Sequence, residues 1–175
     1  GVSQECGVSC PAGVRDASVG VGGPARAAGD WVDPQNTTVM LRNLPNNYSR
    51  DMLIELLDRA GFRRSYDFVY YPVDFKRWAG LGYAFVNLVS HEEALRLWNN
   101  FDGFSDWDLP SNKVVQVCWG TPLQGRADCT ERYRNSPVMH ESVPEQFKPV
   151  VFSDGEPAAF PAPTKKIRNP RWRRI

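Results

Sequence analysis

The segment Leu81–Leu88 constrains the fold most, because two kinds of side chain alternate along it. In a β-strand, successive side chains point to opposite faces of the sheet. Tyr83 and Phe85 therefore share one face, while Ala84, Val86 and Leu88 share the other. Small and branched aliphatic side chains suit a buried face, so two aromatic rings are left on the opposite face. Rings in that position either pack inside the protein or stack on nucleic-acid bases.

A second strand is predicted upstream, over Val39–Leu44, where Pro45 and two asparagines end the extended run. Together the two segments resemble the paired ribonucleoprotein motifs of the RNA recognition motif. The longer motif has eight positions: basic, Gly, aromatic, small, aromatic, aliphatic, any residue and aromatic. Positions two to seven match it here. Two positions depart from the pattern. Leu81 replaces the usual basic residue, and Met40 replaces the usual ring of the shorter motif.

The remaining segments complete an alternating plan of strands and helices. A helix is predicted after the N-cap residue Ser49 and ends before Gly61. A second helix is predicted after Ser90, which forms a capping box with Glu93. Further strands are predicted over 67–71 and 114–119. The predicted fold class is α+β: a ferredoxin-like βαββαβ RNA recognition motif with a four-stranded antiparallel sheet, two helices on one face and a C-terminal helical extension.

With both helices on one face, the other face is predicted to be exposed and to bind RNA. The residues predicted to pack beneath the helices are Val39, Leu41, Val69, Ala84, Val86, Val115 and Val117. The residues predicted to contact RNA from the sheet or its neighbouring loops are Met40, Arg42, Asn43, Phe68, Tyr70, Lys76, Arg77, Tyr83, Phe85, Asn87 and Gln116.

Composition divides the chain into four predicted parts: a disordered N-terminal segment (1–35), the RNA recognition motif (36–122), an extension (123–152) and a disordered basic tail (153–175). The chain does not begin with Met and is expected to be a fragment. Net charge is +1, and residues 36–122 hold nine Lys or Arg against ten Asp or Glu. Six of the last eleven residues are basic, which predicts an electrostatic arm for RNA, a nuclear-import signal or simply a solvated terminus.

Other chemistries have little support in the sequence. The four cysteines and two histidines do not have the spacing of a zinc site. There is no nucleophile elbow, no phosphate-cradling glycine loop and no apolar run of membrane length. We therefore expect a monomeric, intracellular protein of the nucleus or cytoplasm, which is not an enzyme and has no catalytic residue, metal, cofactor or membrane contact.

Several blocks outside the two motifs point to one family. These are residues 37–48, 66–68, 71–76, 82–87 and the extension with Asn135–His140 and Phe147–Phe152. They agree in order and spacing with the C-terminal RNA recognition motif of the Mei-two-like family of meiosis and development regulators, which this chain resembles. The resemblance implies single-stranded RNA as partner and regulation of transcripts after transcription.

Two questions stay open at this stage. The extension either masks the sheet, with Tyr133 or Met139 over Tyr83 and Phe85, or completes the core through Phe147 and Val150–Phe152. We favour the second arrangement. The alternative function is a protein-interaction module on the same fold, with protein partners bound through the helical face or the extension. An enzyme on a ferredoxin-like scaffold, such as an acylphosphatase, is a distant third.

Overall fold

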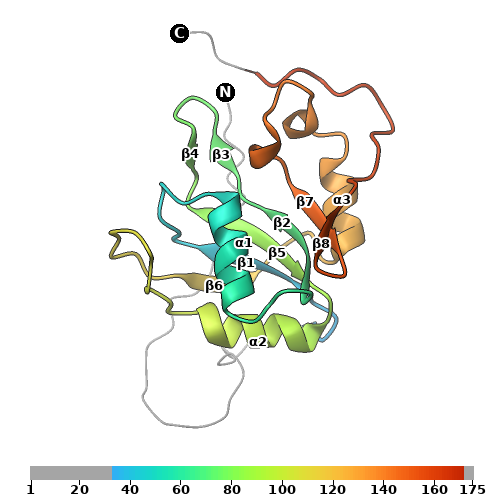
Figure 1. The fold of residues 1–175 in the computed structure, drawn as a ribbon. Helices are drawn as coiled ribbons and strands as arrows, with labels where there is room; N and C mark the ends of the chain where they lie inside the picture. The colour runs from blue at the N-terminus through green and yellow to red at the C-terminus, as the bar shows by residue number, and fades with distance from the viewer. Residues whose placement is uncertain (1–32, 172–175) are drawn as a thin grey trace, which may run out of the picture.

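The computed structural model describes residues 33–171. Its central part confirms the predicted βαββαβ order. In Figure 1, α1 and α2 lie together across the near face of the sheet. The elements of this part are β1 (Thr38–Arg42), α1 (Arg50–Arg59), β2 (Tyr66–Tyr70), β5 (Tyr83–Leu88), α2 (His91–Phe101) and β6 (Gln116–Trp119).

The segment between β2 and β5 forms a short antiparallel hairpin, β3 (Val73–Asp74) with β4 (Ala79–Gly80). Gly80 lies against the buried Tyr71 ring, and a Cβ there would come within 1.9 Å of the Tyr71 hydroxyl oxygen. That hydroxyl donates to the carbonyl oxygen of Pro45 at 3.1 Å. The hairpin is therefore seated against the turn that follows β1 (Figure 1).

The extension adds further elements: α3 (Arg126–Tyr133), the 3₁₀ turns η1 (Pro137–Met139) and η2 (Glu145–Phe147), β7 (Val150–Ser153) and β8 (Glu156–Ala158). The main sheet has six strands in the order β6-β1-β5-β2-β7-β8, rather than the four predicted. It is larger because β7 pairs with the edge of β2, with Val151 opposite Phe68.

One predicted boundary changes as a result. Ser153 and residues 156–158 belong to strands, so the prediction that disorder begins at 153 is wrong for this part. The predicted disordered segment 1–35 lies outside the described residues as far as position 32.

The core lies between the helices and one face of the sheet. All seven residues predicted to pack there are buried in one cluster. The extension contributes to this cluster, because Phe152 of β7 meets the Tyr66 ring edge to face, with a centroid distance of 4.9 Å. The predicted completion of the core by the extension is confirmed for Phe152, and Val150 packs against the same cluster. Phe147 contacts Trp78 of the hairpin instead, at 4.9 Å between ring centroids.

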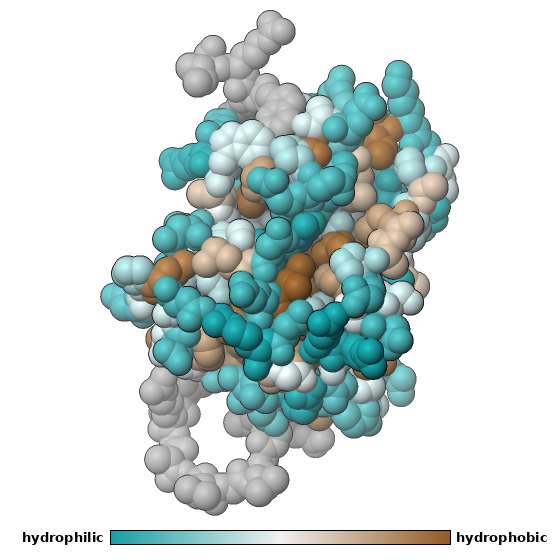
Figure 2. Space-filling model, viewed as in Figure 1, coloured by the Kyte–Doolittle hydropathy of each residue, from teal (hydrophilic) through white to brown (hydrophobic). Residues whose placement is uncertain are grey.

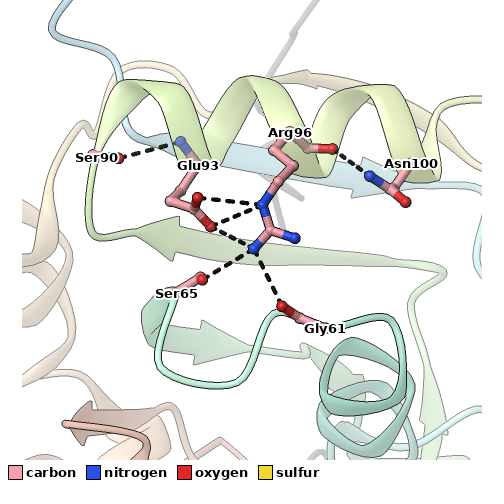
Figure 3. A network of polar contacts seen from close by, with 6 residues as sticks. All are labelled: Gly61, Ser65, Ser90, Glu93, Arg96 and Asn100. Atoms are coloured by element: carbon pink, nitrogen blue, oxygen red, sulfur yellow. Dashed lines mark hydrogen bonds and ion pairs between the residues drawn. The ribbon is translucent and has the colours of Figure 1, made fainter.

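Both predicted helix caps form. The Ser49 hydroxyl oxygen accepts from the Met52 amide at 3.1 Å, and that of Ser90 accepts from the Glu93 amide at 3.2 Å. The Glu93 carboxylate pairs with Arg96 (Figure 3). From α2, the Arg96 guanidinium also donates to Gly61 and Ser65 in the turn between α1 and β2. This network joins α2 to the end of α1, so it stabilises the helical layer on which the sheet rests.

The network predicts a pH-dependent contribution to stability. Hydrogen bonds from Arg96 and then Ser65 lower the pKa of Glu93 below its ordinary value. A carboxyl whose pKa is lower in the folded state stabilises the fold above the unfolded-state pKa, and this contribution is lost as pH falls through the folded pKa. We expect Glu93→Gln to reduce the free energy of unfolding by about 0.5–1 kcal/mol at neutral pH. The difference should shrink as pH is lowered below the ordinary range of a glutamate carboxyl, as measured by urea denaturation at neutral and at acidic pH.

Glu92→Gln is the matched control, because Glu92 lies in the same first turn of α2. The control removes the same charge near the helix N-terminus but leaves the Glu93–Arg96 pair intact. Equal losses for the two variants, or a Glu93→Gln loss that persists at low pH, would contradict this role of the network.

Candidate nucleic-acid interface

The sheet face opposite α1 and α2 is organised by strand register into three rows of neighbouring side chains. Each row crosses several strands, and we name the rows by their relation to α3. The covered row contains Thr38, Asn87, Phe68 and Val151; the middle row contains Cys118, Met40, Phe85 and Tyr70; the outer row contains Gln116, Arg42 and Tyr83.

The covered row is buried beneath the extension. Phe68 and Val151 are 0% exposed and form a second small core with Cys129 of α3. Tyr133, at the end of α3, stacks on Phe68 with ring planes 22° apart and centroids 5.9 Å apart. The same ring contacts Tyr70 at 4.6 Å. Part of the face is therefore masked, as in the less favoured of the two arrangements, although the rings that Tyr133 contacts are Phe68 and Tyr70 rather than Tyr83 and Phe85.

A polar clip holds the start of α3 on β1. The Gln124 side-chain oxygen accepts from the backbone amides of Thr37 and Thr38 at 2.9 and 2.8 Å. Its side-chain nitrogen donates to the carbonyl oxygens of Thr38 and Gly120 at 2.9 and 2.8 Å. Next to it, the Gly125 amide donates to the Thr38 hydroxyl at 2.9 Å. Gly125 has a φ of +89°, a conformation that favours glycine, so the turn into α3 depends on this residue.

Asn87 extends the clip across the sheet. Its side-chain oxygen accepts from the hydroxyls of Thr37 and Thr38, both at 2.8 Å. Its side-chain nitrogen donates to Asp67 at 2.6 Å. Asp67 lies at an irregularity in the pairing of β2 with β5, where Phe68 is the next residue paired and faces Asn87. Burial raises the pKa of Asp67, while the Asn87 hydrogen bond and Arg126 act in the opposite direction.

The middle and outer rows become progressively more exposed with distance from α3. Met40 and Cys118 are 7% exposed, whereas Phe85 and Tyr70 are half-buried. In the outer row, Gln116 is exposed, and Tyr83 is half-buried. The rings of Tyr83 and Phe85 meet edge to face, with centroids 5.7 Å apart. The two rings that first indicated this fold therefore lie on the part of the face that α3 leaves accessible.

The predicted loop residues lie at the margin of the face. Lys76 and Arg77 are exposed at the tip of the β3–β4 hairpin. Asn43 is exposed just after β1, with a φ of +62°, and donates from its side chain to the Val114 carbonyl at 2.9 Å. Its side chain thereby fixes the loop before β6. In the tail, Lys165 and Lys166 are exposed.

Three predicted site residues are not exposed as expected. Phe68 belongs to the core beneath α3, Asn87 is 2% exposed and satisfied by the clip, and Met40 is 7% exposed between Phe85 and Cys118. The prediction that these three side chains lie exposed on the sheet face is wrong. The cause is the same for Phe68 and Asn87: the strand pattern indicates which face a side chain takes, but not what covers that face.

Two residues of the face were missed by sequence reasoning, Gln124 and Arg132. Gln124 contacts residues 86 and 87 positions away, and no local pattern reports such a contact. Arg132 was overlooked within a polar helix, where it precedes Tyr133. Its guanidinium carbon lies 5.5 Å from the centroid of the Tyr133 ring. The signal available was an aromatic and a basic residue side by side in a segment already expected to touch the sheet.

Among residues 33–171, no cluster of three or more His, Cys, Asp or Glu side chains has the arrangement needed to hold a metal ion. In the same range, no helix has the length and apolar character required to cross a bilayer. Burial raises the pKa of the Cys129 thiol to about 11, so this cysteine is a protonated packing residue.

A βαββαβ core with paired rings on the sheet face opposite the helices defines an RNA recognition motif. Residues 36–134 match the family described as RNA recognition motif 2. The chain belongs to that family, and the predicted Mei-two-like relationship is confirmed.

Relatives agree with this assignment. Protein MEI2-like 3 of Arabidopsis thaliana is 38% identical over 130 residues, which is 74% of this chain and 16% of that protein. Protein terminal ear1 of Zea mays is 35% identical over 145 residues, which is 73% of this chain and 22% of that protein. The chain thus spans less than a quarter of either relative.

Among solved structures, the RNA recognition domains of Sex-lethal from Drosophila melanogaster superpose with a TM-score of 0.42 at 24% identity, over 50% of this chain and 51% of that one. The Rna15 RNA recognition motif with bound RNA (GU) gives a TM-score of 0.43 at 15% identity, over 54% of this chain and 94% of that one.

The clip predicts that Gln124 acts on stability. Gln124→Ala removes four hydrogen bonds to part-buried backbone groups. We expect a loss of about 1–3 kcal/mol in the free energy of unfolding, measured by urea denaturation. Gln146→Ala is the control, since Gln146 is exposed in η2. An equally small change in the free energy of unfolding for both variants would show that the clip does not stabilise the fold.

Proposed function

We propose that this chain binds single-stranded RNA on the middle and outer rows of its sheet. The observation that carries the proposal is the pair of rings, Tyr83 and Phe85. They stay partly accessible on a sheet face of which α3 covers one row. Bases stack on such rings whatever their identity, which suits single-stranded RNA with unpaired bases. Gln116 and Asn43 lie exposed nearby and supply amide groups for base edges.

The charge distribution supports a local rather than a bulk electrostatic contribution. Residues 36–122 carry nine basic and ten acidic side chains, so the domain as a whole does not attract a polyanion. Exposed cations at Lys76 and Arg77 on the hairpin, with Arg42 in the outer row, are the groups we assign to phosphate. The basic residues of the tail, such as Lys165 and Lys166, are assigned an auxiliary electrostatic role.

In the cell, we infer that RNA binding of this kind serves post-transcriptional regulation in the nucleus or cytoplasm, as a monomer and without catalysis. The family assignment supports the RNA-binding part of this proposal.

A second candidate function is protein recognition on the helical side. A groove of about 520 Å³ lies between α1 and the β7–β8 hairpin and is lined by Ile54, Val150 and Phe152 among others. Figure 2 shows this apolar surface near the centre of the view, between the positions of α1 and β7. If the variants of the two rings described below bind RNA as well as the wild type does, that result would favour this alternative.

Replacing both Tyr83 and Phe85 with Ala tests the stacking. If each ring stacks on one base, the loss is about 2–6 kcal/mol of binding free energy, measured by fluorescence anisotropy with a randomised single-stranded RNA pool. The matched control is Tyr83→Phe combined with Phe85→Tyr, which keeps both rings. The control should bind within a few fold of the wild type. Undiminished binding by the double Ala variant, with unchanged circular dichroism, would sink the proposal.

Replacing Lys76 and Arg77 with Gln tests the phosphate contacts. Each lost contact should reduce the slope of log affinity against log salt by about 0.7 for a single strand. The control is Arg63→Gln with Arg64→Gln, which removes the same charge where those residues pair with Glu156 and Asp154. Identical slopes for the two double variants would mean that the hairpin does not touch phosphate.

A further inference from the structure

The helix α3 is held at both of its ends. Its start is fixed to β1 by Gln124 and Gly125, as described above. Beyond its end, Arg134 donates to the Ala162 carbonyl oxygen at 2.8 Å, and Asn135 exchanges two hydrogen bonds with Thr164 at 2.9 and 3.0 Å. Between these anchors, Cys129 is 2% exposed in the second core. The helix is therefore held in place beside the sheet face at both of its ends.

Tyr133 places the end of α3 beside the middle row. Its ring lies on Phe68 and Tyr70, the position that a stacked base would otherwise take on β2. Tyr70 pairs in register with Phe85, and Phe85 meets Tyr83. The last turn of α3 thus borders the rings that we assign to RNA.

Arg132 lies on that border with its charge available. Its side chain is exposed, and its guanidinium lies over the Tyr133 ring at 5.5 Å. The neighbouring acid Glu131 pairs with Arg134 at 3.1 Å. Within the described part of the chain, Arg132 itself forms no ion pair. The positive charge of Arg132 also acts electrostatically on Tyr70, which is consistent with its position near the middle row.

The middle row, with Cys118, Met40, Phe85 and Tyr70, carries no cation of its own. The first position of the longer ribonucleoprotein motif, usually basic, is Leu81, which is 50% exposed. Nucleotides stacked on Tyr83 and Phe85 carry phosphates that need cations close to those rings. Arg42 lies opposite Tyr83 in the outer row, and the hairpin cations lie outside the rows.

We propose that Arg132 is an RNA-binding residue. From the end of α3 it supplies a phosphate contact that the longer ribonucleoprotein motif lacks at Leu81. This inference rests on the proposed binding of RNA by the sheet. A guanidinium is suited to the role because its planar fork binds phosphate oxygens through two parallel hydrogen bonds. The contact with the Tyr133 ring restricts the fork before RNA arrives, so less side-chain freedom is lost on binding.

The test compares Arg132→Ala with Arg126→Ala by anisotropy with a randomised single-stranded RNA pool. Both residues are exposed arginines of α3, and Arg126 lies at the opposite end of the helix. We expect Arg132→Ala to lower affinity roughly three- to tenfold and to reduce the salt slope by about 0.7. Arg126→Ala should stay within about twofold of the wild type. Arg132→Lys should recover the salt slope but only part of the affinity, because it keeps the charge and loses the fork.

The outcomes separate this inference from the proposed function. If the wild type binds and the Tyr83 and Phe85 double Ala variant does not, but Arg132→Ala binds like the wild type, the inference alone is overturned. Equal losses for Arg132→Ala and Arg126→Ala also overturn it, since they indicate a non-specific charge effect. If the wild type does not bind the pool, the proposed function fails, and the inference fails with it.

Discussion

The side-chain amide of Gln124 is the contact on which the shape of the binding face depends. It makes four hydrogen bonds to the backbone around β1 and so fixes the direction in which the chain leaves β6. Gly125 then turns the chain into α3, and Asn87 carries the hydrogen bonding across to Asp67. These bonds fix the start of α3, and at the end of the same helix Tyr133 lies on Phe68 and Tyr70.

Covering one row of the sheet has opposite effects on stability and on binding. It buries Phe68 and Val151 completely, which adds a second apolar core to a small domain. It also withdraws a ring from the set that bases could stack on. What remains is a shorter face, with Tyr83 and Phe85 at its centre, the hairpin cations at one margin and α3 at the other. Binding then depends on few contacts, so single charges at the margins carry more weight.

Sequence reasoning succeeded where structure is local. The alternation in β5 and the aliphatic positions of β1 and β6 identified the buried layer, and Ser49 and Ser90 marked both helix starts. It failed where a side chain's surroundings depend on distant residues. Asn87 is a polar residue on a strand, which indicates solvent exposure unless its partners at Thr37, Thr38 and Asp67 are known. Likewise, nothing near β2 in sequence indicates that β7 adds to its edge and that α3 covers it.

The division of the face into a covered row and accessible rows is tested most directly by backbone amide chemical shifts during titration with a short randomised single-stranded RNA pool. The amides of Arg42, Tyr83 and Gln116 in the outer row, together with Phe85, should shift strongly. Those of Thr38, Phe68 and Asn87 in the covered row should shift little, and the ring contact between Tyr133 and Phe68 should persist at saturation. Large shifts across the covered row, with loss of that ring contact, would show that RNA displaces α3 and would contradict this account.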